Sequence, residues 1–497
     1  MVAPTELDAV EARRLIGAKA LSPLELFDAC LAQIAAVNPA VNALVTVAAE
    51  RGRAEAAAAT EAVARGEPLG PLHGLPVAVK DIQLTEGITT TFGSTDFASF
   101  VPRADAGIVR RIRAAGGIVI GKTNIPEFSI GANTVNRLFG ATGNPFDPRL
   151  TCGGSSGGSA VALACELVPL ATGSDHGGSL RIPACYSGVV GHRSSPGVVP
   201  FEERTLTQTF YSVQGPMART VADAGLLQSV IAGRSAGSRR DPMAFPLDAT
   251  GFARLEPLDL SGLRVAVSAD LGGVLVSEAV RATFAERVGR FAGAFAACEE
   301  VGADTLDLTR APEVDWALRQ DVFVAQYARQ AERWDDGFNP NIRQTYDAAL
   351  GTEMVDIARA RRLQIDLYQH ADALFDRFDL LLCPGVSISP FPWRQLNPTE
   401  IDGRPVDNYM AWLNLTAAIT VIGHPVTALP CGLDAAGMPF GIQVIGPMYG
   451  DHTVLRAAAA LEAAFAADPV LARPRPDLAA LRQAPPMPPA AASMPPA

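Results

Sequence analysis

The chain contains the stretch Cys152-Gly-Gly-Ser-Ser-Gly-Gly-Ser159 and, after a short apolar run, the stretch Gly173-Ser-Asp-His-Gly-Gly-Ser-Leu-Arg-Ile-Pro183. Ser155 and Ser179 each follow a pair of glycines in these stretches. Glycine lets several backbone N–H groups converge on one point, because no side chain blocks the approach and a positive φ angle is freely available. Serines held beside converging amides indicate a nucleophile with an oxyanion hole.

The composition excludes several classes of protein. The 497-residue chain carries a net charge of −11, which argues against a nucleic-acid partner because phosphate binding needs a basic face. Its seven cysteines are scattered, and neither a disulfide framework nor a metal site is expected from their spacing. Free thiols of this kind favour a cytoplasmic location. No uncharged apolar stretch is long enough to span a membrane, so no membrane segment is expected.

The alternation of apolar runs with helical periodicity predicts one large α/β domain over residues 1–483. We expect the catalytic core at about 70–225. Strands are expected near 42–47, 74–82, 117–121, 168–173, 380–384, 418–430 and 441–446, and helices near 5–18, 22–37, 48–66, 106–115, 159–167 and 453–466.

Two regions differ from this rhythm. Residues 245–375 are mostly helical in pattern and are expected to form a layer over the substrate side of the core. Part of this region, 316–346, is rich in aromatic residues: Trp316, Phe323, Tyr327, Trp334, Phe338 and Tyr346. The tail from 484 to 497 is almost only Pro, Ala and Met, a composition that predicts disorder.

Glycine-rich loops have other uses, which the neighbouring residues exclude. No Gly-Lys-Ser/Thr follows, so the segment is not a Walker loop, and it has no Gly-x-Gly-x-x-Gly dinucleotide fingerprint. Ser155 and Ser156 both satisfy Gly-x-Ser-x-Gly, the nucleophile elbow of α/β-hydrolases. That elbow needs a strand directly before the serine, whereas residues 144–149 (Asn-Pro-Phe-Asp-Pro-Arg) read as a loop.

A serine nucleophile needs a base, and Lys80 is the favoured candidate. The histidines lie in no recognisable catalytic motif, and His176, three residues from Ser179, is too close in sequence for the usual geometry of a triad base. Lys80 ends the apolar run Val77-Ala-Val79. Burial lowers the pKa of a lysine, because it disfavours the charged form, and so makes a neutral amine available as base.

The ordered motifs resemble those of the amidase signature family, from about Leu24 to about Phe465. The family pattern is a Gly-(Leu/Ile)-Pro strand ending in Val-Lys-Asp, then Gly-Gly-Ser-Ser-Gly-Gly, then Asp-x-Gly-Gly-Ser-x-Arg-x-Pro. The chain matches these three motifs at 74–81, 153–158 and 175–183, and has further family-like motifs at 121–128, 140–145 and 215–220. The resemblance implies a single domain with a mixed, twisted central β-sheet covered by helices on both faces.

The resemblance also implies the roles of the site residues. Lys80 matches the family's base, Ser155 the bridging serine held on a cis peptide, and Ser179 the nucleophile. The backbone amides of His176, Gly177, Gly178 and Ser179 would form the oxyanion hole, and Gly154, Ser156, Asp175 and Arg181 would support the site. His176 stands where Ile or Thr is commoner, so its imidazole is placed to touch the substrate. The implied chemistry needs neither a metal nor a cofactor.

The expected activity is hydrolysis of a small aryl or apolar amide, or of a carbamate (urethane) or ester, through a seryl acyl-enzyme. Tyr186, Phe210 and Tyr211 are candidates for an apolar substrate pocket. The expected partner is the small-molecule substrate, and the expected state is a monomer or homodimer. The alternative is the glutaminase component of a tRNA-dependent amidotransferase, which would need paired charges to hold a zwitterionic amino acid. A phosphate-binding regulatory module is a third class, which Lys80 disfavours.

Overall fold

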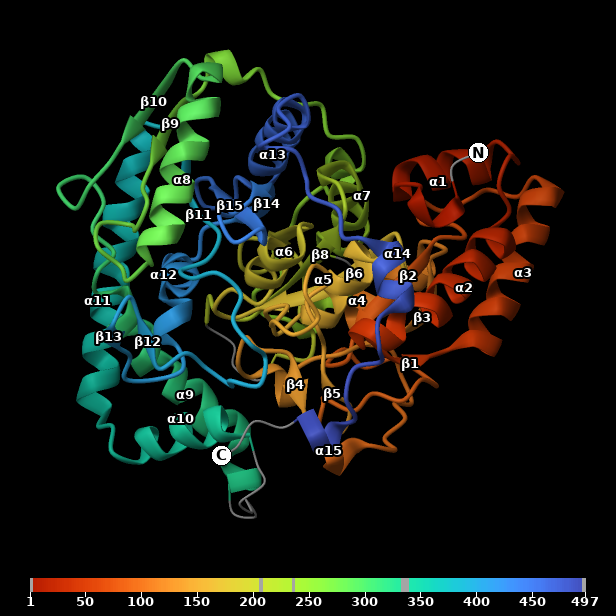
Figure 1. Cartoon of the computed structure of the whole chain (residues 1–497), viewed down its shortest axis with the longest axis horizontal. Helices are drawn as coiled ribbons and strands as arrows, with labels where there is room; N and C mark the ends of the chain where they lie inside the picture. Colours follow the sequence, from red (N-terminus) through yellow and green to blue (C-terminus); the bar gives the residue numbers. More distant parts are fainter. Residues whose placement is uncertain (1–2, 205–208, 235–236, 332–338, 494–497) are drawn as a thin grey trace.

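This computed structural model describes residues 3–204, 209–234, 237–331 and 339–493. The described residues form one domain around an 11-stranded sheet of order β1-β3-β2-β6-β8-β7-β14-β15-β11-β9-β10 (Figure 1). The strands are β1 Leu44–Val47, β2 Pro76–Lys80, β3 Ile118–Thr123, β6 Leu170–Asp175, β7 Val190–Arg193, β8 Val213–Ala218, β9 Arg264–Val267, β10 Ala297–Glu300, β11 Leu380–Pro384, β14 Val426–Leu433 and β15 Pro439–Ile445. Two short hairpins, β4 Val135–Asn136 with β5 Gly140–Ala141 and β12 Glu400–Ile401 with β13 Arg404–Pro405, lie outside this sheet.

The helices fall between the strands as the sequence predicted for most of the chain. They are α1 Ala9–Gly17, α2 Pro23–Val41, α3 Ala49–Arg65, α4 Gly107–Ala114, α5 Gly157–Ala164, α6 Arg181–Ser187, α7 Val221–Ile231, α8 Glu278–Phe291, α9 Ala311–Ala331, α10 Pro340–Leu350, α11 Met354–Asp372, α12 Asn414–Ile422, α13 Asp451–Ala466, α14 Leu478–Gln483 and α15 Ala490–Ser493. Helix α2 begins where its sequence signals it, because Ser22 and Glu25 form a reciprocal capping box.

The sheet is mixed, as the family resemblance implied. Strand β2 is parallel to β3 and β6, and β9 is parallel to β10 and β11, whereas the hairpin β14–β15 and the pairs around β7 and β8 are antiparallel. All five residues of β2 are buried, since β2 has a neighbour on each side and helices above and below. Lys80 therefore ends a strand in the interior of the sheet.

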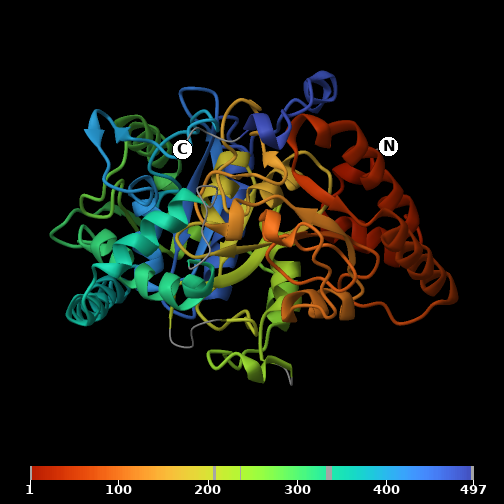
Figure 2. The same ribbon diagram turned by 90° about the horizontal axis from the view of Figure 1, so that it is seen from below.

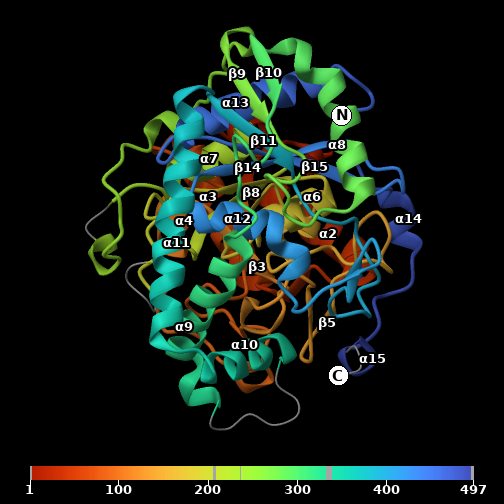
Figure 3. The ribbon, with the colours of Figure 1, turned by 90° about the vertical axis from the view of Figure 1, so that its left-hand side faces the viewer.

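Helices cover both faces of this sheet. Along β15 and just after it, Gly441 and Gln443 contact α6, while Gly446 lies against Val454 of α13. Odd- and even-numbered residues of a strand point to opposite faces, so α6 and α13 lie on opposite sides. The first three helices stand at one end of the molecule and the α8–α11 region at the other (Figures 1 and 2). Helices α9, α10 and α11 pack together there (Figure 3).

One prediction about the second half of the chain is wrong. Residues 418–430 were expected to be a strand, but 414–422 form helix α12 and the strand begins at Val426. Every residue from Leu415 to Ile422 is buried, and a helix buried all round has no amphipathic period to distinguish it from a strand. Residues 245–375 are mostly helical, as predicted, through α8, α9, α10 and α11, and they also contain the two short strands β9 and β10, which extend the central sheet.

The expected disorder of the tail is also wrong for residues 484–493. The Met487 N–H donates to the carbonyl of Pro39 at 2.8 Å, and the Met487 side chain packs against a small cluster of Val135, Ala141 and Trp393. Composition alone cannot reveal one apolar side chain that has a docking site on the domain. Residues 494–497 lie outside the described part of the chain.

Helix α2 is long and apolar enough, by length and composition alone, to cross a membrane. Its Leu26, Phe27, Ile34 and Val37 are buried in the core of the domain, and core helices pass the same test. The helix is therefore weak evidence for a membrane span.

Substitution of Gly158 tests why the motif at 153–158 needs glycine. A Cβ at this position would lie 2.6 Å from the carbonyl oxygen of Ala43 and against the backbone of Asn124, which cannot move aside as a flexible side chain would. We expect Gly158→Ala to lower the free energy of unfolding by about 3 kcal/mol, measured by urea denaturation. The control is Gly262→Ala, because nothing lies within 4 Å of a Cβ there. Equal stability of the two variants would contradict this packing argument.

Candidate active site

Lys80 lies at the centre of the site, at the end of β2. Its Nζ is 2.7 Å from Ser155 Oγ and 2.8 Å from Ser174 Oγ, and its side chain is fully buried. Burial lowers the pKa of Lys80 to about 7, although the negative charge of Asp175 opposes this. A large share of the amine is therefore neutral at neutral pH and can accept a proton.

Ser155 is held in the loop before α5, on a cis Gly154–Ser155 peptide bond. The cis bond expected from the family resemblance is thus present. A Cβ on Gly154 would lie 2.8 Å from Thr134 Oγ1, which donates to the carbonyl of Gly153 at 2.7 Å. The loop also reaches the second Gly-Gly-Ser unit, because the Ser156 N–H donates to the carbonyl of Ser179 at 3.2 Å.

Asp175 organises the loop that carries Ser179. Its carboxylate accepts from the backbone N–H of Gly178 at 2.9 Å and of Leu180 at 3.1 Å. It also pairs with the buried guanidinium groups of Arg181 at 2.9 Å and Arg193 at 3.2 Å. Burial alone would raise the pKa of Asp175, but the two arginines outweigh it and hold that pKa well below its usual range. The carboxylate is thus a permanent charge that fixes the turn.

Of the four backbone amides predicted to form the oxyanion hole, those of His176, Gly177 and Ser179 remain candidates. The Gly178 N–H is occupied by Asp175, so it is not available to an oxyanion in this arrangement, and that part of the prediction is corrected. In the described part of the chain, the amides of Gly177 and Ser179 donate to no acceptor. Gly178 instead supplies the turn: its φ is +123°, and a Cβ would collide with Thr416 Oγ1.

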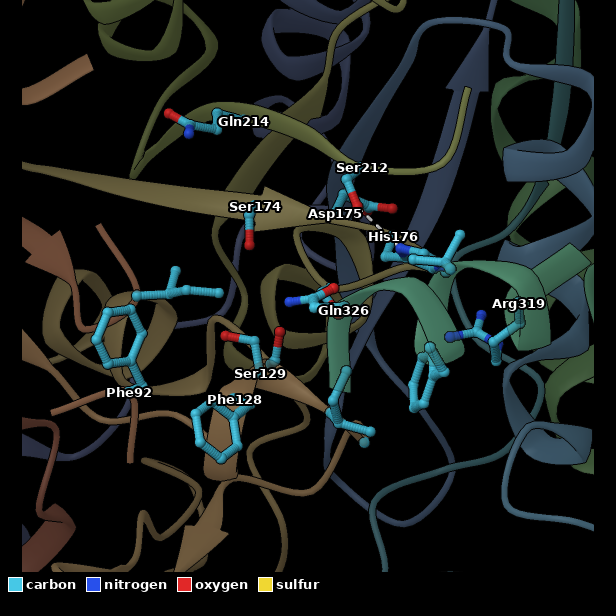
Figure 4. A pocket seen from close by; sticks show the side chains of 18 of the residues that line it. Phe92, Phe128, Ser129, Ser174, Asp175, His176, Ser212, Gln214, Arg319 and Gln326 are labelled. Carbon is cyan, nitrogen blue, oxygen red and sulfur yellow. Dashed lines mark hydrogen bonds between the residues drawn. The ribbon is translucent and has the colours of Figure 1, made fainter. Parts of the chain in front are cut away.

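A cavity of about 480 Å³ opens onto these residues, and Ser155, Ser174 and Ser179 all line it. Among the described residues no hydrogen bond joins Ser179 Oγ to Ser155 Oγ, and catalytic contacts of this kind commonly tighten only when substrate binds. Figure 4 shows Ser174, Asp175 and His176 along one wall.

One end of the cavity is aromatic. Phe92 and Phe97 pack edge-to-face with ring centroids 5.0 Å apart, and Phe128 lies against Phe97 and against Tyr327 of α9. Phe100 and Phe323 line the same cavity. We call this group of six residues the aromatic end (Figure 4 labels Phe92 and Phe128).

The predicted pocket residues lie elsewhere. Tyr186 is fully buried and its hydroxyl donates to the carbonyl of Ile388 at 2.8 Å, while neither Phe210 nor Tyr211 lines the cavity. Tyr211 lies behind the wall, with its ring 5.1 Å from that of His176. Closeness in sequence to Ser179 did not identify pocket residues, because α6 carries Tyr186 away from the cavity into the core.

The aromatic region at 316–346 is partly confirmed as cavity wall, through Phe323 and Tyr327. Trp334 and Phe338 lie outside the described residues. The phenylalanines of residues 92–100 were not predicted to line the pocket. Three phenylalanines in the loop that follows the Lys80 strand could have indicated this. Ser174, which directly precedes Asp175, was not predicted either.

The remaining predicted residues lie close to the centre. Arg181 and Asp175 form the buried ion pair described above, and Ser156 Oγ donates to the carbonyl of Ser174 at 3.2 Å. Within the described ranges no group of three His, Cys, Asp or Glu side chains is arranged to hold a metal ion.

Matches to known proteins cover most of the chain. A family model described as Amidase matches residues 25–455. An acylamidase of Rhodococcus erythropolis is 34% identical over 92% of this chain and 95% of its own. The A subunit of the glutamyl-tRNA(Gln) amidotransferase of Acidothermus cellulolyticus is 33% identical over 92% of this chain and 94% of its own. The crystal structure of a bacterial aryl acylamidase of the amidase signature family has a TM-score of 0.86 at 27% identity, covering 96% of this chain and 98% of that one.

The pH dependence of serine labelling tests Lys80 without a substrate. If the neutral Lys80 amine is the base and the protonated amine is not, we expect the rate at which a fluorophosphonate labels Ser179 to rise as the pH increases through about 7 and then to level off. Mass spectrometry of the adduct gives the rate. Lys80→Met should abolish the pH-dependent labelling, and a rate that rises only near pH 10 would contradict the lowered pKa.

Ser174 is tested by a matched pair of variants. Ser174 and Ser129 both line the cavity, but only Ser174 contacts Lys80. We expect Ser174→Ala to slow labelling of Ser179 about ten-fold, since the amine loses one of its two hydroxyl partners, and Ser129→Ala to change it less than about two-fold. Equal rates in the two variants would show that Ser174 plays no part in holding the base.

Proposed function

The chain belongs to the amidase signature family of amide-hydrolysing enzymes, and on that premise we propose that it hydrolyses a small aryl amide through an acyl-enzyme formed on Ser179. The observation that carries the proposal is the buried Lys80 amine within hydrogen-bonding distance of Ser155 Oγ, in a cavity lined by Ser179 and by the six residues of the aromatic end. Carbamates and esters of similar shape pass through the same tetrahedral state, so the proposal includes them.

In the first half of the reaction, neutral Lys80 accepts the proton of Ser155 while Ser155 accepts that of Ser179. The Ser179 oxygen then adds to the amide carbon. The negative charge that develops on the carbonyl oxygen is taken by the amides of Gly177 and Ser179, each such donor contributing about 3 kcal/mol. The C–N bond breaks as the proton passes back from Lys80 to the leaving nitrogen, which leaves as a neutral amine.

In the second half, a water molecule replaces the amine. Lys80, again neutral, accepts a proton from this water through a hydroxyl neighbour as the water oxygen adds to the acyl carbon. Collapse of this second tetrahedral state breaks the bond to Ser179 and returns the proton to its oxygen. The products are a carboxylic acid and the free enzyme.

The lining of the cavity supports an aryl substrate over free glutamine. Three of the four charged side chains of the described lining are ion-paired within the protein: Asp175 with Arg181 and Arg193, Arg204 with Asp241, and Arg319 with Asp315. The fourth, Glu203, accepts a hydrogen bond from the Gly107 N–H, so both arginines of the described lining already have a carboxylate partner and neither is left for a substrate carboxylate. A glutaminase must hold an ammonium and a carboxylate together, which calls for charges that the protein leaves uncompensated. We therefore favour the aryl amidase over the amidotransferase component as the function, although relatives named as that component match the chain equally well.

The test is turnover by the purified chain alone. We expect hydrolysis of simple 4-nitroanilides without ATP, tRNA or a partner protein, with kcat/KM well above that for glutamine. Ser179→Ala should lose at least about 10⁴-fold in kcat, while Ser261→Ala, on a surface turn, should keep full activity. A higher kcat/KM for glutamine than for every anilide, or activity that appears only with added partner proteins, would overturn the proposal in favour of the amidotransferase component.

A further inference from the structure

The cavity has a second polar group that the acyl-transfer steps do not use. Arg319 of α9 lines the cavity although its residue is only 4% exposed. Its Nη2 lies 3.1 Å from the point where a Cβ on Gly177 would stand, which puts the guanidinium beside the oxyanion loop. Figure 4 shows Arg319 at the opposite end of the cavity from Phe92 and Phe128.

The charge of Arg319 is balanced by a carboxylate that does not line the cavity, that of Asp315. Asp315, one turn earlier on α9, accepts from Arg319 Nε at 3.2 Å and from Nη2 at 3.1 Å, and it is itself buried. Asp315 does not line the cavity. The N–H donors that face the cavity therefore belong to a charged guanidinium whose positive charge is balanced by the Asp315 carboxylate.

His176 adds a second polar group at this end. Its Nδ1 is 2.9 Å from Ser212 Oγ, whereas its Nε2 is buried without a hydrogen-bond partner in the described structure. Burial, together with the nearby charge of Arg319, lowers the pKa of His176 well below its ordinary value, so the ring is neutral. Tyr409, which also lines the cavity, is a further hydrogen-bond partner of the Arg319 side chain.

We propose that Arg319 and His176 form an acyl subsite that binds a second, neutral carbonyl oxygen in the acyl part of the substrate. This inference rests on the proposed function: an aryl amine seated in the aromatic end directs the acyl group from Ser179 toward Arg319. A carbonyl oxygen satisfies the N–H donors without adding charge. A carboxylate would bring a net negative charge into a buried site beside Asp315, and an ammonium would face Arg319, so both are disfavoured.

Binding to the inactive Ser179→Ala variant tests the subsite apart from turnover. The probes are three 4-nitroanilides of matched acyl length: pentanoyl, 4-oxopentanoyl and succinyl. We expect calorimetry to show that the 4-oxopentanoyl compound binds about ten-fold more tightly than either of the others, which is the effect of one hydrogen bond to a charged donor. Adding Arg319→Met with Asp315→Asn, which removes both charges of the pair together, should bring the ratio of 4-oxopentanoyl to pentanoyl affinity to about 1.

The matched control is another arginine–aspartate pair. Arg362 and Asp366 of α11 are spaced like Asp315 and Arg319 along a helix and are paired at 2.9 Å, but they are exposed. Arg362→Met with Asp366→Asn should leave the affinity ratio unchanged. Equal affinities for the pentanoyl and 4-oxopentanoyl compounds, tightest binding of the succinyl compound, no binding of any probe, or a ratio that survives the Arg319 and Asp315 changes would each overturn the subsite.

Turnover of the pentanoyl anilide by the unaltered enzyme reports on the proposed function alone. If that compound is hydrolysed with no preference for the added carbonyl, the subsite fails and the function stands. If the 4-oxopentanoyl compound binds preferentially and no anilide is hydrolysed, the subsite stands and the function fails.

Discussion

The proposed chemistry depends on keeping the Lys80 amine away from water. A lysine in solution is protonated at neutral pH and cannot act as a base. Placing it at the end of an interior strand, with Ser155 and Ser174 as its hydrogen-bond partners, lowers its pKa to about 7. The sheet supplies this environment, because β2 is flanked by β3 and β6 and all of its residues are buried. The same amine can then serve twice, once toward Ser179 and once toward water.

Asp175 is buried as well, but unlike Lys80 it is kept in its charged form. Asp175 is held as a carboxylate by Arg181 and Arg193 and fixes the turn before Ser179 through two backbone N–H groups. Burying ions in this way is costly unless each is paired and hydrogen-bonded. Here the cost is met by a compact cluster in which all three side chains have partners. The result is a rigid loop in which the proposed nucleophile, Ser179, and the free amides of Gly177 and Ser179 line the cavity.

Much of this was readable from the sequence, and the parts that were not share a cause. Motifs that constrain the backbone, such as the glycines at 153–158 and the apolar run before Lys80, predicted the strand and the loops, and the family resemblance implied the cis bond. The pocket residues could not be found in this way, because a cavity wall is made where loops and helices from distant parts of the chain meet. Most strands of the central sheet lie between Phe92 and Phe323 in the chain, yet these two residues line one cavity. Tyr186, close to the nucleophile in sequence, points into the core instead. Helix α12 was mistaken for a strand because complete burial removes the periodicity that separates the two.

The chain has only three lysines, Lys19, Lys80 and Lys122, which makes a direct measurement practical. Protein labelled with ¹³C on the lysine side chains gives three methylene signals beside the amines, and Lys80→Met identifies the signal of Lys80. Exposed Lys19 serves as the reference, and Lys122, whose pKa burial also lowers to about 7, is assigned by its own variant. The account predicts that the Lys80 signal titrates near pH 7. A Lys80 signal that titrates near 10, as in a free lysine, would mean that the amine is charged at neutral pH and would contradict its role as the base.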